Sequence, residues 1–206
     1  MIRTALEFLT GELNLYLKRK DPSNFGNTDS VVLSNLMKPD GTFAIPTDQA
    51  NDNFKIVISL VNIEEDRIAE SQLYYRRVND KIEAINPAVN INAVVLFSVF
   101  ATNYPTALRL LSYIISFFQT HAVFDNEQFP QMNGNVDADK PWQKVGRLLA
   151  TLCPTTFEQQ NNMWAAMGAK YMPSALYKIK TLSFIDIEPK MEAPPITAIN
   201  ISSNGD

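Results

Sequence analysis

The first 17 residues carry hydrophobic side chains at helical spacing. Leu6, Leu9 and Leu13 would share one side of such a helix with Leu17, and charged residues occupy the other side. Proline and glycine within 21–27 then end the pattern. The pattern predicts a first helix that packs on a core, followed by a short strand at 31–37 and a turn at 38–41.

Two later segments have the pattern of buried strands. In 54–63 alternate residues are apolar, which predicts a long strand with one face on the core. In 93–101 both faces are apolar and only Ser98 is polar, as in a central strand that is covered on both sides. Further strands are predicted at 144–153 and 175–187.

A second helix is predicted directly after the central strand. Asn103 can cap this helix, and Pro105 suits its first turn. Its polar residues form one narrow stripe, made of Arg109, Ser112, Ser116 and Gln119. Because the rest of the helix is apolar, we expect it to pack on the sheet and also on a second surface, which a partner subunit could supply.

The apolar stretch 91–118 is long enough to raise the question of a membrane span, which needs about 20 predominantly apolar residues. Asn103, Pro105 and Arg109 interrupt it. The stretch therefore indicates a buried strand followed by a helix, and we expect no integral membrane segment.

A third helix is expected to begin at Thr155, which would form a capping box with Glu158. Phe157, Trp164 and Met167 would mark one face of this helix. We expect three aromatic residues to form a structural core cluster beneath the final strand. These are Trp164, Tyr171 and Tyr177.

Two segments interrupt this regular order of helices and strands. The segment 69–90 has no clean period and is interpreted as a long excursion, a feature more often functional than structural. The segment 188–206 carries Pro189, Pro194 and Pro195, which block pairing inside a sheet, and it ends in a polar run. The sequence thus predicts one α/β domain over 1–187 and an extended or disordered tail over 188–206.

The composition is that of one globular domain with a sizeable core. The chain has 206 residues, of which 46% are hydrophobic and 19% charged, with a net charge of −4. Basic residues cluster only at Lys18-Arg19-Lys20 and at Arg76-Arg77. Such short groups neutralise few phosphates, and the first of them ends the predicted first helix, where cations favour the helix dipole. We therefore expect no nucleic-acid partner.

The residues that carry most protein chemistry are scarce. A single cysteine, Cys153, excludes an internal disulfide and a cysteine-based metal cage, and its apolar surroundings indicate a buried structural thiol. The single histidine, His121, follows an apolar stretch and has no second histidine to share a metal. A catalytic pair of these two residues is compatible with the sequence, but no motif supports it.

Oxygen-bearing residues occur in two further groups. Glu64 and Glu65 are adjacent at the end of a predicted strand, so they point to opposite faces and do not form an acid/base pair. The run 133–139 alternates oxygen side chains as a calcium loop does, but Ala138 and Lys144 stand where an EF-hand needs glycine and glutamate. We therefore expect no catalytic residue, metal or cofactor.

Three segments resemble a known family. They are 57–65, then 92–98 with 103–108, and finally Trp164 with 170–177. In type and order they are similar to the tube-and-sheath terminator (cap) proteins of extracellular contractile injection systems of the antifeeding-prophage type, and the resemblance spans most of 1–186. It implies a mixed, mostly antiparallel sheet flanked by helices, as in phage tail terminators, and a non-enzymatic cap. Such a cap stops the growth of tube and sheath at the end distal to the baseplate, as a sixfold ring.

The resemblance implies inner-tube and sheath subunits as partners and a homo-hexameric ring. In such a ring each contact is heterologous, so every subunit presents one patch and receives its complement. We expect the contacts to come from the excursion and the tail, since aromatic anchors dominate interfaces. The residues expected there are Tyr74, Tyr75, Arg76, Arg77, Pro189, Pro194 and Pro195.

Two other classes of function stay open at this point. One is a monomeric adaptor that binds another protein, and the other is a small enzyme that relies on Asp and Glu. The chain begins in a charged periodic helix rather than a secretion signal, so assembly in the cytoplasm is expected. The sequence is equally compatible with a released particle and with one held at a membrane.

Overall fold

The computed structural model describes residues 1–26, 28–45, 54–66, 74–78, 81–85, 89–140, 143–184 and 191–193. The helices are α1 (Ile2–Lys20), α2 (Pro22–Phe25), the 3₁₀ turn η1 (Pro130–Asn133), α3 (Tyr104–Thr120) and α4 (Phe157–Ala166). The strands are β1 (Val31–Leu33), β2 (Phe54–Glu65), β3 (Tyr74–Val78), β4 (Lys81–Ile85), β5 (Val89–Ala101), β6 (Val123–Asp125), β7 (Arg147–Leu152), β8 (Ser174–Phe184) and β9 (Met191–Ala193).

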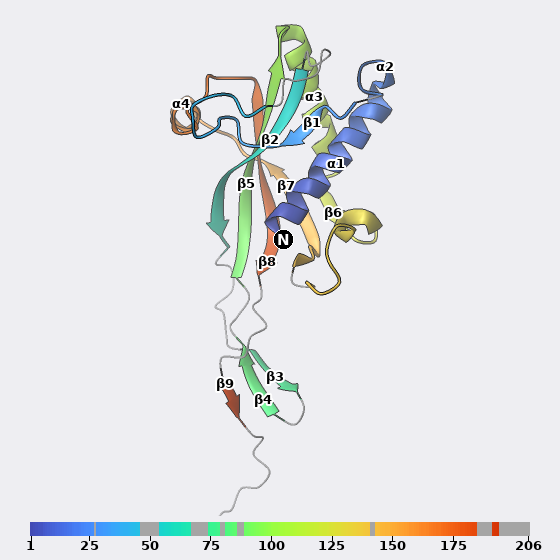
Figure 1. Cartoon of the computed structure of the whole chain (residues 1–206), viewed down its shortest axis with the longest axis vertical. Coiled ribbons are helices and arrows are strands. Elements are labelled where there is room, and N and C mark those ends of the chain that lie inside the picture. The colour runs from blue at the N-terminus through green and yellow to red at the C-terminus, as the bar shows by residue number, and fades with distance from the viewer. Residues whose placement is uncertain are drawn as a thin grey trace, which may run out of the picture.

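Six strands form the main sheet in the order β1-β2-β5-β8-β7-β6 (Figure 1). The short strand β1 runs parallel to β2, and all other neighbours are antiparallel. The expected mixed, mostly antiparallel sheet flanked by helices is therefore confirmed.

Helices α1 and α3 cover one face of this sheet. Their apolar sides pack on Ile58, Phe97 and Ile179, which are fully buried. Aromatic rings fill the space between α3 and the central strands, with Phe118 5.0 Å from Phe97 and 4.2 Å from Tyr177 between ring centroids. This face holds the larger of the two apolar clusters.

Helix α4 and the segment 34–45 cover part of the opposite face. Leu36, Ile45 and Trp164 pack there on Val57 and Leu96. Since β5 contributes buried residues to both clusters, the central strand covered on both sides is confirmed. None of the helices in the described part of the chain is long and apolar enough to cross a membrane.

A separate three-stranded sheet, in the order β3-β4-β9, lies beyond the end of the main sheet at which β5 begins (Figure 1). The segment 69–90, which the sequence indicated to be an irregular excursion, contains two of these strands, because β3 and β4 form an antiparallel hairpin. The third strand of this sheet comes from the tail, where Met191 pairs with Ala84 and Ala193 pairs with Ile82. Part of the segment 188–206 is thus a strand at the edge of this sheet.

Several element boundaries differ from the expected ones. The strand expected at 31–37 stops at Leu33 and is followed by a single bridge between Met37 and Phe43. The capping box expected at Thr155 lies one residue later. The Thr156 hydroxyl accepts from the backbone N–H of Gln159, and the side-chain oxygen of Gln159 accepts from the backbone N–H of Thr156. Phe157 is therefore the first residue of α4 and is 93% exposed, so it does not share the face of buried Trp164.

Candidate interaction surface

The carboxylates and the reactive side chains singled out by the sequence have structural partners. Glu64 accepts a 2.7 Å ion pair from Lys178, and this hydrogen bond raises the pKa of the Lys178 ammonium. His121 packs edge-on against Phe117, with 5.7 Å between ring centroids. Cys153 is half-buried rather than buried, because it follows the last residue of β7, and its Sγ lies 3.9 Å from the Thr151 carbonyl oxygen.

The loop after η1 uses its polar groups to hold its own shape. The Asn133 amide donates to the Val145 carbonyl at 2.9 Å and accepts from the Val145 N–H at 2.7 Å. Asp137 pairs with Lys140 at 2.7 Å. Across the described residues, no three His, Cys, Asp or Glu side chains come together as a metal site would require.

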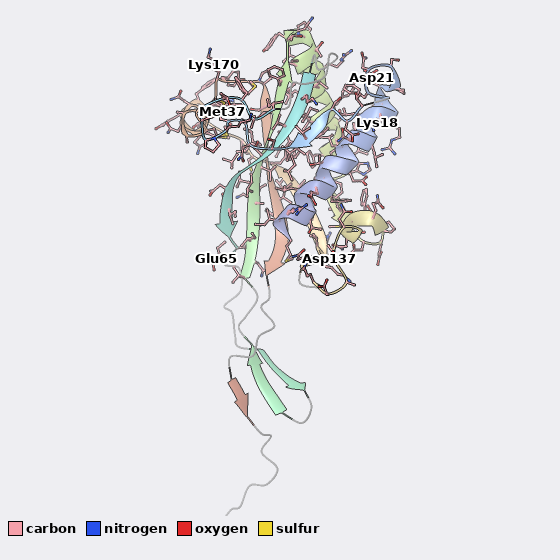
Figure 2. The ribbon with its side chains drawn as sticks, viewed as in Figure 1. Lys18, Asp21, Met37, Glu65, Asp137 and Lys170 are labelled. Carbon is pink, nitrogen blue, oxygen red and sulfur yellow. The ribbon has the colours of Figure 1, made fainter. Side chains whose placement is uncertain are left out.

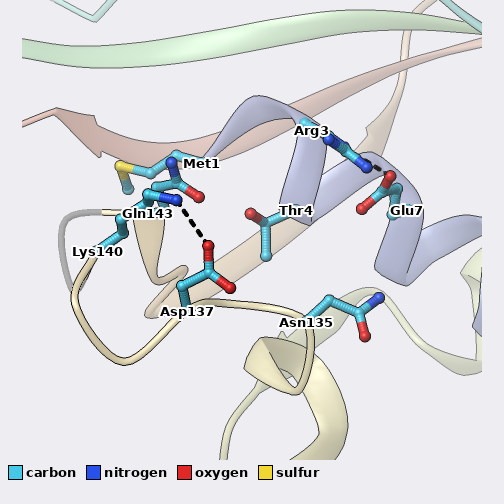
Figure 3. A pocket seen from close by; sticks show the side chains of 8 residues that line it. All are labelled: Met1, Arg3, Thr4, Glu7, Asn135, Asp137, Lys140 and Gln143. Atoms are coloured by element: carbon cyan, nitrogen blue, oxygen red, sulfur yellow. Dashed lines mark hydrogen bonds and ion pairs between the residues drawn. The ribbon is translucent and has the colours of Figure 1, made fainter.

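A polar pocket of about 590 Å³ lies between the start of α1 and this loop (Figure 3). Its charged residues satisfy one another, since Arg3 pairs with Glu7 at 2.8 Å and Lys140 pairs with Asp137. Hydrogen bonding to Lys140 lowers the pKa of the Asp137 carboxyl, and partial burial lowers the pKa of the Met1 amine. Both carboxylates that line the pocket are thus engaged in ion pairs with neighbouring cations.

A second hollow, of about 320 Å³, is lined mostly by apolar and aromatic residues and lies where β5 meets α3. Phe43, Tyr104 and Tyr171 line it, and their side chains are 44%, 66% and 63% exposed. Its floor includes Val99 and Ala107, which are both buried. We call this site the aromatic hollow.

Local structure fixes the walls of the aromatic hollow. Asn103 caps α3 by accepting from the Thr106 N–H, which places Tyr104 at the first position of the helix. The Val99 N–H donates to the Pro173 carbonyl at 2.8 Å and so ties the loop that carries Tyr171 to β5. Lys170 lies on that loop, lines the hollow and forms no ion pair with any described residue.

The outer face of α3 continues the apolar surface from Tyr104. Leu108 and Ile115 are exposed and Leu111 is partly buried, and with Tyr104 they follow one another at helical spacing. We call these four residues the α3 stripe. The expectation that α3 has more apolar surface than the sheet can cover agrees with this exposure.

Aromatic side chains around a hollow and an exposed apolar helix face are typical of protein–protein contacts. A family model described as the Pvc16 N-terminal domain matches residues 4–198. The chain belongs to the Pvc16 N-terminal domain family.

Two solved structures have the fold of this Pvc16 N-terminal domain. One is the PVC sheath/tube terminator of an extracellular contractile injection system in its extended state, with a TM-score of 0.61 and 14% identity over 100% of this chain and 64% of that one. The other is the anti-feeding prophage cap, a tube terminating cap, with a TM-score of 0.53 and 14% identity over 95% of this chain and 60% of that one. The chain thus spans less than two thirds of either protein. Comparison with curated proteins finds no match.

The three aromatic residues expected in one core cluster occupy three different environments of the Pvc16 N-terminal domain. Tyr177 is buried beneath α3, whereas Trp164 is buried on the opposite face of the sheet. Tyr171 is exposed and touches the Trp164 ring edge-on at 5.8 Å between centroids. The expectation of one core cluster is therefore wrong, because Tyr177 and Trp164 lie on opposite faces of the sheet and Tyr171 is exposed on the loop before β8.

Four of the residues expected to make contacts lie in the small sheet. Strand β3 contains Tyr74, Tyr75, Arg76 and Arg77. Pro189, Pro194 and Pro195 lie outside the described residues. The aromatic hollow was not expected from the sequence, because its walls come from three distant segments.

Proposed function

We propose that this chain is the part of a terminator that caps the tube and sheath of a contractile injection particle at the end distal to the baseplate. The observation that carries the proposal is the match of the family model to 4–198, joined to a fold shared with a sheath/tube terminator and a tube terminating cap. The partners in this proposal are inner-tube and sheath subunits, and six copies form a closed ring.

The physical demands on a cap agree with the described surface. A cap needs a rigid core, one surface for each neighbouring copy and one for the polymer end, and it needs no chemistry. The α3 stripe and the aromatic hollow supply exposed apolar area on the main body, and the small sheet supplies a second, separate element. We propose Tyr74, Tyr75, Arg76 and Arg77 as contact residues within that sheet. Pro189, Pro194 and Pro195 are the proposed contact residues of the tail.

The proposed role is structural rather than enzymatic, and the particle is assembled in the cytoplasm. Both similar structures are described as terminators or caps, and one of them belongs to an extracellular contractile injection system. A ring that ends a polymer needs binding energy alone, which apolar and aromatic contacts supply.

Deletion of the gene, followed by electron microscopy of the particles, tests the proposal. The expected result is tubes and sheaths of irregular length with open distal ends, restored by the complete gene. Particles of normal, uniform length with intact distal ends would show that the proposal is wrong.

A pair of point variants localises the effect on α3. Ile115→Asp places a charge on the α3 stripe and is expected to fail in complementation, because burying an unpaired charge in a contact costs several kcal/mol. Ser116→Asp adds the same charge to the adjacent exposed residue on the polar side and is the matched control. Equal complementation by both variants would exclude the α3 stripe as a contact.

A further inference from the structure

The aromatic hollow has the shape and chemistry of a site for a short extended segment. Its volume of about 320 Å³ is at the low end for ligand pockets and too small for a helix or a domain. Three exposed rings surround it, so aliphatic side chains would fill it and remove those rings from water. Lys170 provides one cation among the lining residues. The hollow therefore favours an aliphatic segment that carries a single negative charge.

The segment 196–206 of this chain has that composition. It contains Ile196, Ile199 and Ile201, and Asp206 is its only charged residue. It has no proline, and its β-branched residues favour an extended backbone. Its charge is opposite to that of Lys170.

The segment cannot reach the hollow of its own chain. It follows β9, where Ala193 pairs with Ile82 in the small sheet, beyond the start of β5 (Figure 1). The hollow is at the other end of β5, a strand of 13 residues that spans about 40 Å. Ile201 follows Ala193 by eight positions and so lies within about 29 Å of it even when the chain is fully extended. Figure 2 shows Lys170 at the end of the body away from the small sheet and Glu65 at the end nearest it.

We propose that the aromatic hollow binds the segment 196–206 of a second copy of this chain. Ile199 and Ile201 enter the hollow, and the Asp206 carboxylate lies beside the Lys170 ammonium. The contact is heterologous, because each copy gives a segment and receives another, and such contacts close into a ring when the rotation between copies allows it. The inference rests on the ring proposed above and identifies one of its contacts.

Disulfide trapping between two differently tagged copies tests the contact. Both copies carry Cys153→Ser, which removes the native thiol; one carries Tyr171→Cys and the other Ile199→Cys. Oxidation is expected to link the two tags, both in purified protein and in assembled particles. The matched control replaces Tyr171→Cys by Leu15→Cys, at another exposed apolar position, on α1. No link in either preparation, an equal link to position 15, or links only to tube or sheath subunits would overturn the proposal.

A charge exchange tests the pairing without a new covalent bond. Lys170→Glu and Asp206→Lys are each expected to weaken self-association about two- to fivefold, as for an exposed ion pair, and the double variant is expected to restore it. Sedimentation equilibrium of the purified chain measures this, with Lys144→Glu as the charge-matched control. If gene deletion alters tube length while the two exchanges leave association unchanged, the contact is wrong and the terminator role stands. If deletion leaves the particles normal, the terminator role fails whatever the trapping shows.

Discussion

At the scale of single residues, buried amides link segments that the hydrophobic pattern cannot align. Asn14 is 8% exposed on α1, and its side chain accepts from the N–H groups of Ser30 and Val31 and donates to the Val31 carbonyl. The three hydrogen bonds, at 2.9–3.0 Å, hold β1 against the helix. A polar residue on the apolar side of α1 therefore determines where the first strand begins.

Asn14→Ala is expected to lower the free energy of unfolding by about 2–3 kcal/mol. The substitution leaves two N–H groups and one carbonyl without their partner in a buried site, which outweighs the gain of at most about 0.7 kcal/mol from the better helix former. Urea denaturation followed by circular dichroism measures the change. Asn135→Ala, at an exposed position, is the control and is expected to stay within about 0.5 kcal/mol. Equal effects of the two substitutions would show that the hydrogen bonds of Asn14 to Ser30 and Val31 do not stabilise the fold.

Tyr177 predicts a pH dependence at the same scale. Burial raises its pKa, so the folded chain keeps the phenol protonated at a pH where the unfolded chain ionises it. The contribution of the protonated Tyr177 side chain to the free energy of unfolding is fully present below the ordinary tyrosine pKa of about 10. It is lost as the pH rises through the folded-state pKa. Between about pH 9 and pH 11, the wild-type chain should lose more stability than Tyr177→Phe, as measured by denaturation midpoints. Parallel losses in the two proteins would show that Tyr177 titrates as an exposed tyrosine.

At the scale of elements, the pattern predicts those segments whose burial follows from their own period. Helix α1, strand β5 and helix α3 were predicted because each carries an apolar face long enough to recur. The small sheet was missed because β3 and β4 have five residues each, and Arg76 pairs in register with Glu83 at its centre. The aromatic hollow was missed for another reason, since periodicity within an element does not report which distant segments meet.

At the start of α4, the sequence pattern could not distinguish between two adjacent candidate cap residues. Thr155 and Thr156 are adjacent, and Glu158 and Gln159 can each complete a capping box. The extended backbone of Thr156, with φ −75° and ψ 162°, makes it the cap. Thr156→Ala is expected to cost about 1 kcal/mol of stability, whereas Thr155→Ala should change it by less than about 0.5 kcal/mol. Thermal denaturation of the two variants measures the difference, and a larger effect at Thr155 would place the helix start where the sequence pattern put it.

At the scale of the whole molecule, the chain divides into a packed body and a small sheet that the body does not cover. Among the described elements, the small sheet packs chiefly on itself, and Figure 1 shows it beyond the main sheet. Its three strands are short, with five residues in β3, five in β4 and three in β9, and they pair in one register in which Tyr75 lies opposite Ala84 and Ala84 opposite Met191. A sheet of such short strands buries little surface within itself, so packing against another surface would stabilise it. In the proposed ring, a neighbouring subunit or the tube end supplies that surface.

Hydrogen exchange distinguishes a sheet that needs a partner from one that is stable alone. In dilute purified protein, the backbone amides of β3 and β4 are expected to exchange rapidly, because among the described elements these strands pack chiefly on each other and on β9. In assembled particles the same amides should become protected, since burial against a partner makes opening costly. The amides of β5 between Ala93 and Val99 are the internal control, because they are buried on both faces and should be slow in both preparations. Slow exchange of β3 and β4 in the isolated protein would mean that the small sheet is stable without a partner, and the proposal that tube or neighbour covers it would lose its support.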